Sequence, residues 1–78
     1  MPMSSELCMP QLGMMMMEGT LLHWLVPDGA RVKAGQDVAE IESEKAVQAV
    51  PAPEDGVLRQ LVAEGQVVPV LSVIGTVE

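Results

Sequence analysis

The chain repeats its own pattern, and this repeat restricts the possible folds more than any other feature. Residues 25–42, LVPDGARVKAGQDVAEIE, align without a gap with residues 61–78, LVAEGQVVPVLSVIGTVE, at an offset of 36 positions. The matching pairs are Leu25 with Leu61, Val26 with Val62, Asp28 with Glu64, Gly29 with Gly65, Val32 with Val68, Val38 with Ile74, Ile41 with Val77 and Glu42 with Glu78. With one gap, the match extends back to Gly19 and Gly56. A repeat this short cannot bury its own apolar face, so we expect the two copies to pack together as a pair of small sheets.

The composition favours strands in both copies. The chain is 49% hydrophobic but has no Phe or Tyr and one Trp, so Val, Leu, Ile, Ala and Met must fill the core, and short branched side chains favour strands. Asp28-Gly29 and Glu64-Gly65 occupy matching turns, where glycine supplies a positive φ. We therefore predict an all-β flattened barrel or sandwich. Strands are predicted over residues 6–12, 19–26, 31–33, 37–43, 46–50, 56–62, 67–70 and 71–77.

The length and charge limit what such a chain can be. Residues 1–78 are enough for one small domain, with repeat halves of about 12–43 and 47–78. Only four Lys and Arg residues stand against eleven Asp and Glu, which weighs against binding to nucleic acid or to an anionic membrane. Because the first residues lack the basic start and apolar stretch of a secretion signal, we expect no targeting segment in this chain, and a single Cys cannot form an internal disulfide. We expect a location in the bacterial cytoplasm, or in the mitochondrial matrix if the source is a eukaryote.

Lys45, in the stretch IESEKA of residues 41–46, lies at the junction of the two copies, whereas the other lysine, Lys33, lies inside a copy. One interpretation is a solvated hairpin lysine paired with Glu42 or Glu44, a contact that contributes 0 to ~1 kcal/mol. The other is a modified lysine. The nearby carboxylates favour the charged ammonium, so Lys45 would be a poor base but an acceptable substrate for a separate enzyme that acylates it. If the halves are related by a rough twofold, Lys45 and the carboxyl terminus project from opposite ends.

Four stretches of the chain form a longer pattern over residues 9–78: MPQLGMMMMEGTL, WLVPDGARVKAGQDVAEIESEKA, VPAPEDGVLRQLVAEGQVV and LSVIGTVE. Together, in this order and spacing, they resemble the lipoyl domains of the dihydrolipoyl acyltransferases in 2-oxo acid dehydrogenase complexes. The resemblance implies two four-stranded antiparallel sheets with quasi-twofold symmetry and a modified lysine at a hairpin tip, here Lys45. It also implies lipoic acid in amide linkage on Lys45 as a swinging arm, in a domain with no catalytic residues. The residues themselves lack metal-ligand spacing, so we expect no metal site.

The resemblance further implies the enzymes that handle such an arm. A lipoate ligase or lipoyl transferase attaches the lipoyl group, and a thiamine-dependent decarboxylase acylates it. An acyltransferase core then passes the acyl group to coenzyme A, and dihydrolipoyl dehydrogenase reoxidises the dithiol. Glu42, Glu44 and Ala46 are expected to contact the ligase or the decarboxylase. We also expect the isolated domain to be monomeric and to derive from a longer acyltransferase chain.

This sequence departs from the commonest family pattern at Glu44, where Asp usually precedes the lysine, so the charge is kept with one extra methylene. Two alternatives remain open on the same fold. Biotin carriers have a lysine at the corresponding position but flank it with methionines, whereas Glu44 and Ala46 flank Lys45 here. An unmodified structural or adaptor domain would use Lys45 only as a turn residue.

Two other groups of residues have simpler structural interpretations. The run Met14–Met17 offers thioethers to a soft metal such as Cu(I), but neither His nor Cys stands beside it. We expect it to be a flexible apolar segment over an edge of the core, with part of it exposed and prone to oxidation. Cys8, His23 and Asp28 include the residue types of a nucleophile, a base and an orienting acid, but no motif links them, so we expect no catalytic role.

Overall fold

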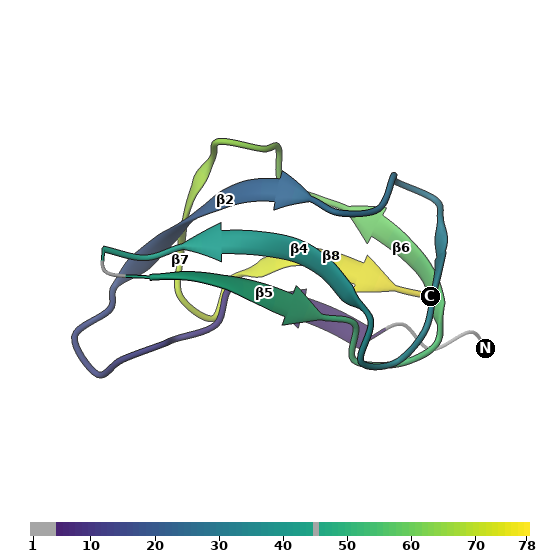
Figure 1. Cartoon of the computed structure of the whole chain (residues 1–78), viewed down its shortest axis with the longest axis horizontal. Helices are drawn as coiled ribbons and strands as arrows, with labels where there is room; N and C mark the ends of the chain where they lie inside the picture. Colours follow the sequence, from purple (N-terminus) through teal and green to yellow (C-terminus); the bar gives the residue numbers. More distant parts are fainter. Residues whose placement is uncertain (1–4, 45) are drawn as a thin grey trace.

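The structure, a computed structural model, describes residues 5–44 and 46–78, which form strands and turns and no helix (Figure 1). The eight strands are β1 (Ser5–Cys8), β2 (Glu18–Trp24), β3 (Arg31–Val32), β4 (Asp37–Glu42), β5 (Val47–Pro51), β6 (Gly56–Gln60), β7 (Val67–Pro69) and β8 (Val73–Val77). In these described ranges, nothing helical is long and apolar enough to pass through a bilayer.

The strands form two four-stranded antiparallel sheets that pack face to face. One sheet has the order β1-β8-β6-β3 and the other has the order β5-β4-β2-β7. Each sheet therefore takes strands from both copies of the repeat, so neither copy forms a sheet by itself. This arrangement confirms the predicted all-β flattened barrel of two four-stranded sheets.

The core lies between the two sheets and is made of aliphatic side chains and one methionine. In β4 the pattern puts Val38, Ala39 and Ile41 inside and leaves Asp37 and Glu42 in solvent. The largest fully buried side chains are Met9, Leu21, Ile41, Leu58, Ile74, Val38 and Val77. Burying one Leu, Ile or Val contributes about 1.5–3 kcal/mol, so these few residues dominate the stability of a domain without Phe or Tyr.

Two hydrogen bonds at repeat-related positions join the two copies of the repeat. The backbone N–H of Trp24, at the end of β2, donates to the Glu64 carboxylate at 2.8 Å, and the backbone N–H of Gln60, at the end of β6, donates to the Asp28 carboxylate at 2.8 Å. Each pair is related to the other by the offset of 36 residues. The acid of each predicted turn thus accepts the N–H of the last residue of a strand that belongs to the other copy.

The glycines that follow these acids adopt the predicted conformation. Gly29 and Gly65 both have φ of 86°, in the left-handed region where a side chain is disfavoured. The same φ at these matching positions shows that both glycines supply the positive φ predicted for the acid-Gly turns.

Two predicted strand boundaries are wrong because turns interrupt the apolar runs. The first strand was expected to reach residue 12 but ends at Cys8, and Pro10 soon afterwards has no N–H for a ladder. The last strand was expected from residue 71 but begins at Val73, because Leu71 has φ of 68° and lies in a turn. The Leu71 N–H donates to the Met9 carbonyl at 2.8 Å, so a hydrogen bond connects the turn before β8 to the segment that follows β1.

Replacing Leu71 by glycine is expected to stabilise the domain by about 0.5–1 kcal/mol. The repeat-related position is Gly35, with φ of 84°, and the Leu71 side chain is 68% exposed, so the substitution relieves backbone strain and loses little burial. Urea denaturation of both forms measures the difference. The reverse change, Gly35→Ala, adds a methyl group with nothing within 4 Å and should destabilise by a similar amount. Equal stability of Leu71→Gly and the parent would contradict the strain argument.

Candidate functional site

The hairpin of β4 and β5 positions the residues singled out at the junction of the repeat. The strands pair from Asp37 opposite Pro51 to Glu42 opposite Val47, and the Ser43 N–H donates to the Ala46 carbonyl at 2.8 Å. The Ser43 hydroxyl donates to the same carbonyl at 3.3 Å. These two hydrogen bonds hold Ser43 and Ala46 next to each other, so they fix the positions of the first and last residues of the turn.

The predicted residues on either side of the lysine are exposed. Lys45 itself lies outside the described residues. Glu42, Glu44 and Ala46 are all exposed, and none of them makes an ion pair with another residue of the described ranges. The end of β4 and the start of β5 lie at one end of the long axis, and the C-terminal residue of the chain lies at the other (Figure 1). This separation agrees with the expected opposite placement of the turn and the carboxyl terminus.

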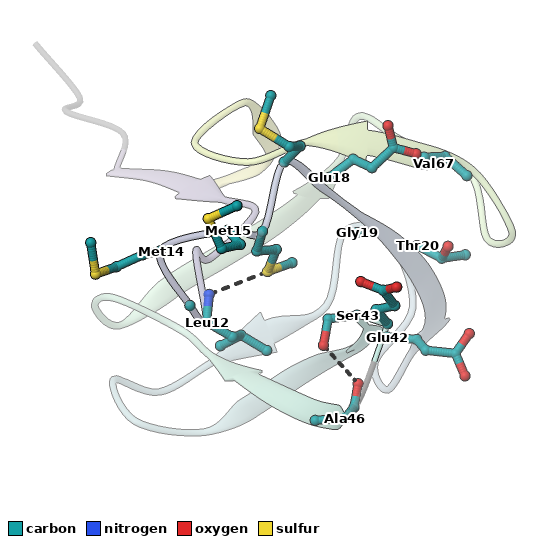
Figure 2. Close-up of a pocket in the computed structure, with 14 residues that line it drawn as sticks. Leu12, Met14, Met15, Glu18, Gly19, Thr20, Glu42, Ser43, Ala46 and Val67 are labelled. Atoms are coloured by element: carbon teal, nitrogen blue, oxygen red, sulfur yellow. Dashed lines mark hydrogen bonds between the residues drawn. The ribbon is translucent and has the colours of Figure 1, made fainter.

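An open groove of about 780 Å³ lies beside this turn. One wall is segment 12–20, which joins β1 to β2 and enters β2, and the other consists of Glu42, Ser43, Glu44 and Ala46. Figure 2 shows the two walls facing each other, with Val67 of β7 at the rim. The strand register brings the walls together, because Thr20 pairs with Glu42 on one side and with Val67 on the other.

The groove combines acidic and apolar groups. Glu18, Glu42 and Glu44 are exposed carboxylates at its margin, and the methionines supply an apolar, sulfur-containing wall. The carboxylates favour a positively charged side chain beside them, and the methionines favour contact with an apolar chain. The groove therefore suits a long side chain with a polar attachment and an apolar body.

The run Met14–Met17 divides into two kinds of side chain. Met16 is half-buried, packs against the core, and its Sδ accepts a hydrogen bond from the Leu12 N–H at 3.2 Å. Met14, Met15 and Met17 are 94%, 90% and 77% exposed. The expected cover over an edge of the core is thus provided by Met16, and the other three side chains face solvent.

The remaining candidates do not form a site. Cys8 is half-buried on β1 of one sheet, and His23 is exposed on β2 of the other. The Asp28 carboxylate accepts the Gln60 N–H, and no hydrogen bond joins any two of the three side chains. Among residues 5–44 and 46–78 there is no group of three or more His, Cys, Asp or Glu side chains able to hold a metal ion.

Comparison with known proteins decides the family. Residues 5–77 match the Biotin_lipoyl family model, described as "Biotin-requiring enzyme". The chain belongs to the biotin/lipoyl family. The family match confirms the resemblance that the four sequence stretches indicated. The two-sheet barrel is the fold that carries the β4–β5 turn.

Curated relatives of this biotin/lipoyl domain are components of the acetoin cleaving system and of pyruvate dehydrogenase. It is 39% identical, over 95% of its length, to the dihydrolipoyllysine-residue acetyltransferase component of the acetoin cleaving system of Cupriavidus necator. It is 40% identical, over 94% of its length, to the corresponding component of the pyruvate dehydrogenase complex of Zymomonas mobilis. The mitochondrial pyruvate dehydrogenase protein X component of Mus musculus is 39% identical over 76% of the domain. The chain spans 20%, 18% and 12% of the lengths of these relatives.

The methionine wall of the groove is the part of the site that the sequence pattern did not indicate. Segment 12–20 and segment 42–46 are more than twenty positions apart along the chain. They become neighbours only through the pairing of β2 with β4, in a register that shifts between Leu21 and His23. Predicting the groove would have required this register, which local residue patterns do not encode.

Proposed function

We propose that this chain is a lipoyl carrier domain in which Lys45 bears an amide-linked lipoyl group. The observation that carries the proposal is the combination of the family match with a lysine between Glu44 and Ala46, in the turn of a hairpin whose flanking residues are exposed. Residues 1–78 act as one carrier domain, with repeat halves of about 12–43 and 47–78. The bound lipoyl group supplies a dithiolane that accepts an acyl group and two electrons.

The residues of the chain bind, orient and present the arm without performing catalysis. The Ser43 N–H to Ala46 carbonyl hydrogen bond keeps the two sides of the turn close, and this supports presentation of the intervening lysine to other enzymes. Glu42 and Glu44 are exposed and offer carboxylates to a ligase or a decarboxylase. Ala46 leaves the following position small, so an approaching active site meets little steric hindrance.

The partners proposed for the domain follow from its relatives. Two of the relatives named above are dihydrolipoyllysine-residue acetyltransferase components. We therefore assign this domain to a 2-oxo acid dehydrogenase type of complex or a related cleavage system. A thiamine-dependent decarboxylase, an acyltransferase core and dihydrolipoyl dehydrogenase would use the arm in turn. The bacterial cytoplasm or the mitochondrial matrix is the corresponding compartment, and we propose that the isolated domain is a monomer.

A biotin carrier is the second candidate, because the matching family model is described by the words "Biotin-requiring enzyme". Glu44 and Ala46 beside Lys45 favour lipoyl, since the resemblance associates flanking methionines with biotin carriers. The two functions differ in which ligase accepts the domain as a substrate.

Co-expression with a lipoate ligase and lipoic acid is expected to increase the intact mass by one lipoyl amide per chain. Parallel co-expression with a biotin ligase and biotin is expected to leave the mass unchanged, because the residues flanking Lys45 differ from those of biotin carriers. A biotin adduct without a lipoyl adduct would reverse the assignment. A folded domain that gains neither group would indicate an unmodified structural or adaptor module.

A further inference from the structure

The groove beside the 42–46 turn holds a concentration of exposed thioethers, and their chemical reactivity is a property beyond contact with an apolar chain. Met14, Met15 and Met17 are 94%, 90% and 77% exposed, although large apolar side chains are usually at least partly covered. All three line the groove beside the 42–46 turn, and Figure 2 shows the Met14 side chain extending outward from the loop. Their sulfur atoms are therefore accessible to small reagents in solution.

The same segment contains two methionines in different surroundings. Met16 is half-buried, and its Sδ accepts the Leu12 N–H at 3.2 Å, so its sulfur takes part in the internal structure of the loop. Met9 is fully buried, with 0% exposure. The molecule thus has an accessible group of three thioethers and two protected thioethers within nine residues, which provides an internal comparison of reactivity.

We infer that Met14, Met15 and Met17 form a methionine-oxidation site for hydrogen peroxide or a similar two-electron oxygen donor, and that its oxidation slows modification at the neighbouring turn. The sulfur lone pair attacks one peroxide oxygen, the O–O bond breaks and an S–O bond forms. The departing hydroxide takes up the remaining proton and leaves as water. The sulfur loses two electrons, which reduce the peroxide. A methionine sulfoxide reductase reverses the change with electrons from a dithiol.

Oxidation changes the wall of the groove that faces the turn. A sulfoxide oxygen is a strong hydrogen-bond acceptor, so an apolar surface becomes polar and hydrated. Met14 and Met15 line the same groove as Glu42, Glu44 and Ala46, so a ligase that covers this turn also covers these side chains. Covering a sulfoxide without a donor is unfavourable, and we expect modification to slow on the order of tenfold. This consequence rests on the proposed carrier function, whereas the oxidation itself does not.

The oxidation site is tested on the folded, unmodified chain with hydrogen peroxide. Cleavage after Glu6 and Glu18 yields peptide 7–18, which holds Met9 and Met14–Met17 and separates them from Met1 and Met3. Fragment masses then give the rate at each sulfur. Met14, Met15 and Met17 are expected to oxidise on the order of tenfold faster than Met9, with Met16 between them. Equal rates at all five positions in the folded chain would overturn the site.

The consequence is tested by removing the peroxide and adding lipoate ligase with lipoic acid. The matched control replaces Met14, Met15 and Met17 by leucine, which keeps the wall apolar and removes its oxidisable sulfur. Peroxide treatment should slow lipoylation of the parent and leave the control unaffected, and methionine sulfoxide reductase should restore the parent. Unchanged lipoylation of the oxidised parent would overturn the regulatory role. If the untreated parent takes up no lipoyl group while these sulfurs still oxidise selectively, the carrier function fails and the oxidation site stands.

Discussion

Replacing Lys45 by arginine is expected to abolish the lipoyl mass gain completely. Amide formation needs a neutral amine that attacks an activated acyl group, and a lysine can lose its proton to provide one. The arginine guanidinium remains protonated and non-nucleophilic at neutral pH, because its pKa lies far above neutrality. The substitution keeps the positive charge between Glu44 and Ala46, so the loss would reflect the nucleophile and not the local charge. Intact mass spectrometry after co-expression with the ligase measures the result.

The matched control is Lys33→Arg, because the chain contains only these two lysines. Lys33 follows β3, and its backbone N–H donates to the Gln36 side-chain carbonyl at 3.0 Å, an interaction that an arginine also makes. This variant should gain one lipoyl group at the parental rate. A lipoyl adduct on the Lys45→Arg variant, or the absence of an adduct on the Lys33→Arg variant, would contradict Lys45 as the attachment site.

Replacing Gly75 by alanine is expected to destabilise the domain by about 2–3 kcal/mol. Gly75 is in the middle of β8 and pairs with Leu7 on one side and Gln60 on the other. A Cβ at this position would lie 2.7 Å from the Arg59 carbonyl oxygen and 3.2 Å from the Trp24 ring. The Trp24 indole N–H donates to the Val62 carbonyl at 2.9 Å, so the ring cannot move aside without losing that bond.

The effect is large relative to the whole domain, since 78 residues correspond to a total stability of about 4–12 kcal/mol. The expected loss lowers the melting temperature by about 10–20 °C, which circular dichroism detects directly. Gly13→Ala is the control, because a Cβ at Gly13 has nothing within 4 Å and its backbone is not in the left-handed region. Equal melting temperatures for Gly75→Ala and Gly13→Ala would refute the close packing of Trp24 on β8.

The candidate site was predictable only in part. The repeat and the stretch IESEKA direct attention to Lys45, Glu42, Glu44 and Ala46 because position in a repeat is visible in the sequence itself. The run Met14–Met17 was visible as an apolar segment, but its place beside the turn was not. Whether a side chain lines a groove depends on which distant strand becomes its neighbour, and that information is absent from the local pattern.

The sequence by itself determined the eight strands, the acid-Gly turns and the packing of two small sheets. These features depend on side-chain alternation, on the need of glycine at positive φ and on the inability of a short repeat to bury its own face. Only the tertiary structure decided that Asp28 and Glu64 each end a strand of the opposite copy, and that Leu71 takes the conformation of Gly35. It also decided that the methionine wall faces the β4–β5 turn. These contacts join residues far apart in the chain, so they arise from the register of paired strands and from packing across the core, to which every strand contributes.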